Sequence, residues 1–292
     1  MSRGRGGYIG FNRVPAASAV NSEASGAWTL REAEALKRAG TWPIAFLNPT
    51  QITGLQLWLD ASDAQTLFDA TTGGSLVAAD GTVARWQDKS GNNRHATQST
   101  AGSRPARKAS LINGRDALRF GGSDDRLIVP TSAINFGSSD FEIFLVGRGN
   151  ASYNTFFSCI DLSSGTAYVL RMMTESARLQ ATVRNISGGA LDVNAASNSY
   201  TAQSLVLFGF RRSSSTFTAT RNSTSLGTAS NGDPMQSTNE VAAIGAWVEG
   251  PPTAFYYHLN GDICEIIIYN TALTIASRAL IENYLLAKWG IT

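Results

Sequence analysis

A strand-length run near the C-terminal end of the chain constrains the fold more than any other feature. Residues 263–269 read Ile-Cys-Glu-Ile-Ile-Ile-Tyr, and a turn signal, Asn260-Gly261-Asp262, precedes them. Because side chains alternate along a strand, we expect one face with Cys264, Ile266 and Ile268 and another with Ile263, Glu265, Ile267 and Tyr269. Both faces are largely apolar, which predicts a strand inside a sheet.

A helix is expected directly after this strand. Thr274 can cap its first turn, and Gly290 can end it after about residue 288. The apolar and aromatic positions near one stripe of this helix are Ile281, Tyr284, Leu285 and Trp289. The chain therefore closes with a central strand and an amphipathic helix.

This tail resembles the closing strand and helix of bacterial and phage domains with a laminin-G-like, concanavalin A-like jelly roll. In that family a Gly-Asp-Ile-x-Glu-Ile-Ile-x-Tyr strand leads through a Leu-Thr/Ser turn to a helix ending Tyr-Leu-x-x-Lys-Trp-Gly. The matching residues here are Gly261, Asp262, Ile263, Glu265, Ile266, Ile267, Tyr269, Leu273, Thr274, Tyr284, Leu285, Lys288, Trp289 and Gly290. The resemblance implies a fold, whereas that fold serves binding, catalysis and assembly alike.

Earlier stretches fit the same pattern. Residues 55–60 resemble the family's opening Leu-x-Leu-Trp-Leu-Asp strand, and residues 83–96 resemble its most recognisable internal stretch. In that stretch Asp88 and Ser90 can bond back to the backbone, as a tight turn requires. Strands are expected at 55–60, 117–120, 141–147, 155–160, 167–172, 179–184, 204–210, 215–221, 241–246 and 263–269.

These observations predict an all-β fold for residues 52–292. We expect a two-sheet antiparallel jelly-roll sandwich, concanavalin A-like by resemblance, with a short C-terminal helix. Residues 1–51 are expected to form a separate extended arm with one short helix over about 29–38, where Thr29 and Glu32 form a capping box.

Composition narrows the class of protein. An apolar fraction of 43% supports a real core, while charged residues make up only 16% of the chain. A net charge of +2 gives no overall attraction to nucleic acid or membrane. We find no run long enough to span a bilayer and no signal-peptide pattern, so synthesis in a host cytoplasm is expected. Cys159 and Cys264 are expected to be buried free thiols.

The arm also resembles a known segment. Gly7-Tyr8-Ile9-Gly10, Ser25-Gly26-Ala27-Trp28-Thr29-Leu30 and Gly40-Thr41-Trp42-Pro43 are similar to the N-terminal arm of tailed-phage structural proteins, where such a segment precedes varied domains. The resemblance implies docking to other virion proteins, and the alternative is an ordinary linker helix. The expected docking residues are Tyr8, Ile9, Phe11, Arg13, Trp28, Leu30 and Trp42.

No catalytic set is visible in the linear sequence. A glycosidase on this fold would need two carboxylates flanking the scissile bond. The nearest candidates are Asp140 with Glu142, and Asp262 with Glu265, which strict alternation places on opposite faces. His95, in a turn, and His258, among aromatics, are expected to be structural. Glu265, surrounded by isoleucines, must be paired if it is buried, so no catalytic residue is assigned.

The sequence supports a metal site or a nucleic-acid site no more strongly than a catalytic site. The turn-adjacent aspartates have the oxygens that calcium uses, but turn formation is the favoured role and no metal ligand is assigned. Calcium stays open as a cofactor on the resemblance to laminin-G relatives. Arg104, Arg107 and Lys108 form the only basic cluster, which does not indicate nucleic-acid binding. The turn aspartates are Asp60, Asp63, Asp88 and Asp262.

Aromatic residues in or beside loops are the candidate ligand contacts. Three consecutive aromatics at 255–257 cannot all face a core, so at least one is expected to be exposed or at an interface. Such rings serve equally as a sugar platform or as an interface anchor. The candidate residues are Tyr153, Trp247, Phe255, Tyr256 and Tyr257.

Together the two resemblances imply a non-enzymatic virion structural protein of a tailed phage. It would be a head decoration or tail fibre component that docks through its arm and displays a lectin-like sandwich for host glycan adhesion. By analogy with virion appendages it is expected to be a homo-oligomer, a trimer. The alternatives are a carbohydrate-binding receptor protein and a polysaccharide-degrading glycosidase or lyase on the same fold.

Overall fold

The chain divides into two compact units, Met1–Gln51 and Ile52–Thr292. The computed structural model describes residues 48–129, 139–160, 169–185, 187, 189–233, 235, 241–249 and 254–292, the backbone of 7–8 and 28–29, and residue 34. In the first unit β1 (Gly7–Tyr8) pairs antiparallel with β2 (Trp28–Thr29), and η1 (Pro49–Gln51) is a short 3-10 helix.

The arm residues can be followed only in part. Tyr8 and Trp28 face one another in the β1–β2 pairing, and Glu34 is helical, within the expected helix. The docking role of the arm remains a prediction. The expected docking residues that lie outside the described residues are Ile9, Phe11, Arg13, Leu30 and Trp42.

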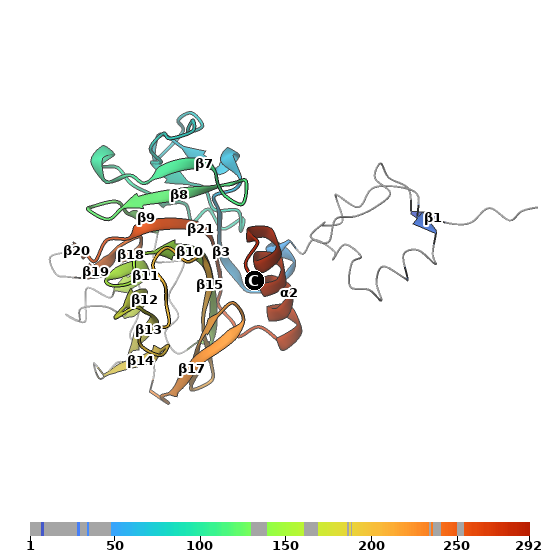
Figure 1. Cartoon of the computed structure of the whole chain (residues 1–292), viewed down its shortest axis with the longest axis vertical. Helices are drawn as coiled ribbons and strands as arrows, with labels where there is room; N and C mark the ends of the chain where they lie inside the picture. The colour runs from blue at the N-terminus through green and yellow to red at the C-terminus, as the bar shows by residue number, and fades with distance from the viewer. Residues whose placement is uncertain are drawn as a thin grey trace, which may run out of the picture. The chain divides into compact units, whose positions relative to one another are not determined.

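The second unit is a sandwich of two antiparallel sheets, which confirms the predicted all-β fold (Figure 1). An eight-stranded sheet has the order β17-β16-β15-β10-β21-β8-β7, and β3 also pairs with β21. Its strands are β3 (Leu55–Asp60), β7 (Ala106–Ile112), β8 (Arg115–Gly121), β10 (Phe141–Gly149), β15 (Val206–Ser213), β16 (Thr216–Arg221), β17 (Thr224–Ser230) and β21 (Asn260–Tyr269).

The facing sheet has nine strands in the order β14-β13-β12-β11-β18-β9-β6-β5-β4. Its strands are β4 (Leu67–Phe68), β5 (Arg85–Trp86), β6 (Ala96–Thr97), β9 (Leu127–Val129), β11 (Asn154–Ile160), β12 (Leu170–Glu175), β13 (Arg178–Arg184), β14 (Ala190–Asn194) and β18 (Val241–Ile244). The remaining elements are the 3-10 helices η2 (Ala64–Thr66) and η3 (Ala101–Ser103), the hairpin β19 (Trp247–Glu249) with β20 (Ala254–Tyr256), and α2 (Ile275–Trp289).

The core lies between the sheets. Large apolar side chains from both inner faces interdigitate there, with Phe141 and Phe210 packed edge to face at a centroid distance of 5.7 Å. Cys159 and Cys264 are free and fully buried, as predicted, and burial raises the pKa of both thiols. Among the described residues, no helix is both long and apolar enough to span a bilayer.

Strand β21 departs from the strict alternation that the sequence predicts. Its pairing with β10 shifts by one residue, because Glu265 faces Val146 whereas Ile263 faces Gly147. Cys264 is therefore the extra residue of a β-bulge. As a result Ile263 joins Ile266 and Ile268 in the core between the sheets, and the predicted division of faces is wrong at this end of the strand.

The close approach of a neighbouring strand explains why the strand motif has a glycine at position 261. β21 pairs with β10 along one side and, on the other, with β8 and then β3, arranged end to end. A Cβ atom on Gly261 would lie 2.0 Å from the carbonyl oxygen of Arg148 and 2.6 Å from the Cα of Gly149. Both contacts are with backbone, so only glycine lets β10 approach so closely.

The turn after β5 is built as the sequence predicts. The Asp88 carboxylate accepts the backbone N–H groups of Ser90 at 2.8 Å and Arg94 at 3.0 Å, which closes the turn. It also accepts the N–H of Trp58 at 3.0 Å, which ties the turn to β3. Asp88 is thus a structural carboxylate.

Helix α2 lies on the outer side of the eight-stranded sheet (Figure 1). The Thr274 side chain accepts the N–H of Ser277, and Gly290 ends the helix in the left-handed conformation, both as predicted. Ile281, Leu285 and Trp289 form its buried stripe.

The fully buried carboxylate of Glu265 connects this helix to the sheet. Every donor that reaches it lies at 2.8 Å: the indole N–H groups of Trp58 and Trp289, the Tyr284 hydroxyl and the Lys288 ammonium. Lys288 also contacts Asp60 at 2.7 Å. The sequence prediction that Glu265 is paired if buried is confirmed.

Burial and neighbouring charges shift the pKa values of the groups in this network, in some cases in opposite directions. Burial raises the pKa of Glu265, and Lys288 offsets only part of that shift. Burial acts in the same direction on Asp60, but Lys288 and Lys89 outweigh it, so the pKa of Asp60 is lowered. Burial, and then the charge of Glu265, raise the pKa of Tyr284, so its hydroxyl remains a donor.

The strands of the two sheets that the sequence pattern does not predict are those that end the two sheet orders, β7, β17, β14 and β4, together with the short inner strands β5, β6 and β9. An edge strand has one neighbour, and many of its side chains face water. For example, β17 is exposed or half-buried along its whole length. Its sequence therefore lacks the apolar alternation that marks an inner strand.

Replacing Glu265 by leucine should lower the free energy of unfolding by about 3–5 kcal/mol, because buried donors lose their acceptor. Chemical denaturation followed by tryptophan fluorescence measures this change. Asp80→Asn is the control, since Asp80 also pairs with a lysine, Lys108 at 2.7 Å, but is 74% exposed. That variant should leave the midpoint essentially unchanged. Equal effects from the two variants would contradict the anchoring role of Glu265.

Candidate functional site

The predicted ligand-contact aromatics gather at one place, although they are distant in sequence. Tyr153 precedes β11, Trp247 begins β19, Tyr256 ends β20, and Tyr257 follows it. Trp247 faces Tyr256 in the β19–β20 register, so their side chains share one face of the hairpin. We call Tyr153, Trp247, Tyr256 and Tyr257 the aromatic cluster.

Tyr257 is the centre of the aromatic cluster. Its ring stacks on Tyr153 at a centroid distance of 5.1 Å and an interplanar angle of 24°. The same ring meets Trp247 at 4.9 Å and 41°. Tyr153, Tyr256 and Tyr257 are 52%, 48% and 42% exposed, so the cluster presents ring surface to solvent. The prediction that at least one ring of 255–257 is exposed is confirmed.

The backbone holds the two stacked tyrosines in an uncommon conformation. Tyr153 and Tyr257 have positive φ values of 54° and 47°, which bulky side chains rarely adopt. The N–H of Thr155 donates to the carbonyl of Tyr257 at 3.0 Å and joins the two segments. Strain of this kind persists where the surrounding structure fixes it, and such positions cluster at binding sites.

Buried groups support the hairpin from below. The Ser158 hydroxyl donates to the Ala246 carbonyl at 2.8 Å and accepts the N–H of Val248 at 3.0 Å. The Arg171 guanidinium lies 4.5 Å from the centroid of Trp247, a cation–π contact. Phe255 packs with Val248 on the opposite face of the hairpin, against a small apolar cluster and Arg126. Phe255 therefore shapes the hairpin rather than the exposed ring surface.

The carboxylates considered for hydrolysis are held in structural bonds. Glu142 accepts the N–H of Leu273 at 3.0 Å and pairs with Arg278, and Asp140 accepts the N–H of Ser214. The bulge in β21 places Asp262 and Glu265 on the same outer face, so the predicted opposite orientation is wrong. Each nevertheless has its own bound donors.

The outer face of the nine-stranded sheet carries polar side chains but few acids. Over β11–β14 the described outward positions include Ser158, Arg171, Gln180 and Thr182. Asp192 accepts the Thr182 hydroxyl at 2.6 Å, and the other outward carboxylate, Glu175, lies at the end of β12. This arrangement does not set two carboxylates on either side of a substrate position.

The turn-adjacent aspartates already have partners. Asp60 accepts from Lys89 and Lys288, and Asp63 pairs with Lys89 at 2.9 Å. Asp262 binds two arginines, and Asp88 closes its turn. Within the part of the chain that the structure describes, no cluster of three or more His, Cys, Asp or Glu side chains has metal-binding geometry.

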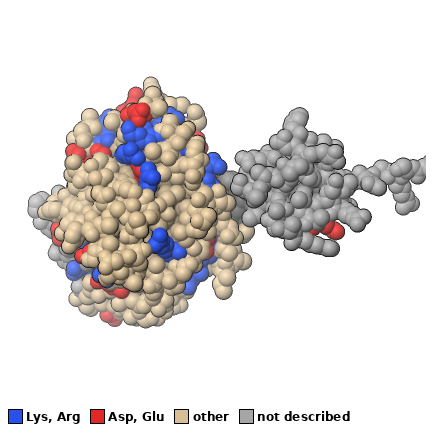
Figure 2. Space-filling view, in the orientation of Figure 1, with Lys and Arg blue, Asp and Glu red and all other residues tan. Residues whose placement is uncertain are grey.

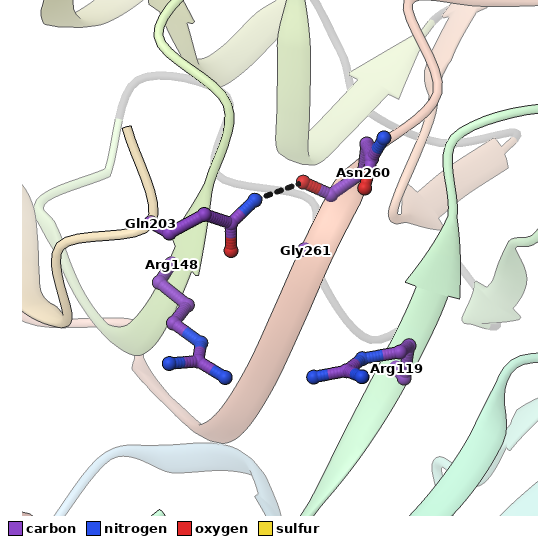
Figure 3. A pocket seen from close by; sticks show the side chains of 5 residues that line it. All are labelled: Arg119, Arg148, Gln203, Asn260 and Gly261. Atoms are coloured by element: carbon purple, nitrogen blue, oxygen red, sulfur yellow. Dashed lines mark hydrogen bonds between the residues drawn. The ribbon is translucent and has the colours of Figure 1, made fainter. Parts of the chain in front are cut away.

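A pocket that the sequence does not suggest lies beside the start of β21. It has a volume of about 370 Å³ and is lined by Arg119, Arg148, Gln203, Asn260 and Gly261 (Figure 3). Its two arginines are 29 residues apart in sequence, so no basic run marks them. On the face shown in Figure 2, acidic and basic atoms are mixed near β7 and most of the described surface is uncharged.

Comparison with solved structures places this fold beside toxin binding domains. Similar structures include the binding domain of Paraclostridial Mosquitocidal Protein 1, with a TM-score of 0.56, 15% identity and coverage of 82% of this chain and 52% of that one. The botulinum neurotoxin D ligand-binding domain in complex with N-acetylneuraminic acid has a TM-score of 0.53, 9% identity and coverage of 80% and 50%. The binding domain of botulinum neurotoxin DC in complex with SialylT has a TM-score of 0.54, 12% identity and coverage of 82% of this chain and 52% of that one.

At these identities the likeness shows the fold alone, and the chain spans about half the length of those domains. No protein-family model and no curated protein matches the sequence. The laminin-G-like and phage assignments therefore rest on the motif resemblances.

His95 should make stability depend on pH. Its Nδ1 accepts the N–H of Asp88 at 3.1 Å, so the ring is unprotonated there. Burial, and then Arg85, lower the pKa of His95 below its ordinary 6.5, with Asp88 opposing them. As the pH falls, the unfolded chain protonates His95 before the folded protein does. The contribution of His95 to the free energy of unfolding is therefore fully present above about pH 6.5 and is lost as the pH drops below it.

Urea denaturation at pH 7 and pH 5 tests this dependence. His95→Asn keeps an acceptor but cannot titrate, so it should lose less stability than the wild type between the two pH values. Carboxylates common to both proteins cancel in the difference. Equal losses would show that His95 does not contribute.

Proposed function

We propose that the 52–292 unit is a non-enzymatic, lectin-like module that binds a surface glycan on the aromatic cluster. The observation that carries the proposal is the stacking of two exposed tyrosines, Tyr153 and Tyr257, beside the half-buried ring of Trp247. Aromatic rings offer apolar faces that cover the C–H face of a sugar, while tyrosine hydroxyls reach its polar edge.

The fixed geometry of the aromatic cluster favours binding over a purely structural role. Exposed aromatic rings leave apolar surface in contact with water, which is unfavourable. Two of these rings also belong to residues with strained backbone. A site that is already rigid loses little conformational entropy when a ligand binds. The similar structures named above are binding domains, two of them solved with N-acetylneuraminic acid or SialylT, which supports the class of function.

The absence of paired acids on the described outer face supports a binding rather than a hydrolytic role. A lyase or glycosidase would need groups that approach the scissile bond together. The carboxylates considered above instead have structural partners: Asp88 closes a turn, Glu265 anchors α2 and Asp262 binds two arginines.

We further propose that the 1–51 unit docks the module onto a virion, on the head or on a tail appendage, as a homo-oligomer, a trimer by analogy. This proposal rests on the resemblance of the arm motifs to tailed-phage structural proteins. Localisation to the virion belongs to the same proposal.

Native affinity electrophoresis of the full chain tests glycan binding. Gels cast with a panel of bacterial surface polysaccharides should retard the wild type without clearing the stained polymer. Tyr257→Asn, which tolerates positive φ but removes the central ring, should reduce the apparent affinity at least tenfold. Retardation with clearing around the band would contradict the non-enzymatic assignment.

Leu280→Ala is the matched control, because Leu280 on α2 is 41% exposed, close to the exposure of Tyr257. It should migrate like the wild type in every gel. If no polymer of the panel retards the wild type, or if both variants lose retardation equally, the aromatic cluster is not a glycan site.

The virion proposal has its own test. Phage particles purified from a lysate that expresses this chain should contain it at a fixed ratio to the major capsid protein, measured by quantitative mass spectrometry. Antibodies against the sandwich should label intact particles at their surface. Recovery of the chain only in the particle-free fraction would contradict virion docking.

A further inference from the structure

The pocket beside β21 is built from two arginines that flank one strand. Arg148 comes from β10 and Arg119 from β8, and β21 runs between them. Figure 3 shows the two guanidinium groups turned toward one another below Gly261, with Gln203 and Asn260 above. A volume of about 370 Å³ lies within the range of small-ligand sites, roughly 300–1,000 Å³.

The pocket keeps a net positive charge. The buried carboxylate of Asp262 accepts from Nε of Arg148 at 2.6 Å, and from Nε and Nη2 of Arg119 at 2.9 and 3.2 Å. Two guanidinium groups against one carboxylate leave one positive charge, since arginine stays protonated. The other terminal nitrogens of both arginines make no hydrogen bond to the residues that the structure describes.

Asp262 therefore acts as a brace. It fixes the orientation of both guanidinium groups in the folded protein, so a ligand does not have to order these side chains when it binds. Their side chains are 42% exposed at Arg119 and 25% exposed at Arg148, so the unused donors remain accessible. Preset guanidinium groups bind a carboxylate through paired N–H donors.

The rest of the pocket suits a polyol. The Gln203 amide nitrogen donates to the Asn260 carbonyl and to Oδ1 of Asn150, both at 3.1 Å, which fixes the side chain. Its amide oxygen points into the pocket as an acceptor for a hydroxyl group (Figure 3). A pocket with donors for an anion and a neighbouring acceptor for a hydroxyl group is complementary to a sugar that carries an acid group.

The pocket lies within reach of the aromatic cluster. Tyr257 and Asn260 are three Cα–Cα steps apart, so at most about 11 Å separates their Cα atoms. Asn154, the neighbour of Tyr153, accepts the N–H of Asn260 at 2.7 Å and holds the two regions together. Asn260, which lines the pocket, is thus close in the chain to Tyr257 and is hydrogen-bonded to the residue next to Tyr153.

We propose that the Arg119–Arg148 pocket binds the carboxylate of an acidic sugar unit, so that the glycan of this module is an anionic polysaccharide. The choice of polymer rests on the proposed glycan-binding function. One net positive charge matches a singly charged carboxylate better than a doubly charged phosphate. The aromatic cluster supplies contact area, and the pocket supplies selectivity for the acid.

Titration of the full chain with D-glucuronate, followed in ¹H–¹⁵N spectra of the arginine side chains, tests the pocket directly. The Nε–H resonances of Arg119 and Arg148 should shift and saturate with glucuronate. D-glucose, and sodium acetate or inorganic phosphate at matched ionic strength, should shift them far less. No shift with glucuronate, or equal shifts with acetate or phosphate, would overturn an acidic-sugar site.

Affinity electrophoresis separates this proposal from the general one. Alginate and polygalacturonate are compared with the same polymers after reduction of their carboxylates to alcohols. The wild type should be retarded at least fivefold more strongly by the native polymers, and Arg119→Gln and Arg148→Gln should abolish that preference. Lys108→Gln is the control, because it removes one charge at a surface ion pair on β7.

The outcomes distinguish the two proposals. Equal retardation by native and reduced polymer, with no glucuronate shift, would overturn the pocket while glycan binding stands. A saturable glucuronate shift without retardation by any polymer would support the pocket and overturn polysaccharide binding. Loss of preference in Lys108→Gln as well would show a general charge effect and count against the pocket.

Discussion

The carboxylate of Glu265 lies where water cannot solvate it, between the eight-stranded sheet and α2. A carboxylate in such a place is tolerated only if its neighbours donate to it, because the cost of removing it from water exceeds the return of one hydrogen bond. Trp58 from β3 and Tyr284, Lys288 and Trp289 from α2 together meet that requirement. The first and last elements of the sandwich are thereby fixed to its central strand.

This constraint explains why a strand motif and a helix motif occur together in the tail. Once β21 places Glu265 on the outer face, the helix must deliver donors at the spacing of one helical face, as Tyr284 and Lys288 do four residues apart. The ammonium of Lys288 lies between two carboxylates, Glu265 and Asp60, and Lys89 supplies a second cation to Asp60. The polar residues of the motif that surround Glu265 hold α2 against the sheet.

The same strand positions the second acidic group. The bulge at Cys264 turns Asp262 to the outer face, where it meets Arg119 and Arg148, whereas regular alternation would direct it into the core. A one-residue irregularity thus decides whether the arginine pocket exists. The aromatic cluster depends on tertiary structure in another way, since its rings come from a β10–β11 turn and a separate hairpin that only the sheet brings together.

The sequence by itself determined the fold class, most of the long strands, the capped helix and the need for a partner at Glu265. These follow from local patterns, namely alternation, caps and the cost of burying charge. It also singled out the exposed tyrosines, because consecutive aromatics cannot all face one core. Only the tertiary structure decided the edge strands, whose exposed side chains carry no pattern, and the bulge, which depends on the pairing with β10. The pocket belongs with these, because Arg119, Arg148 and Gln203 become neighbours only when strands distant in sequence lie side by side.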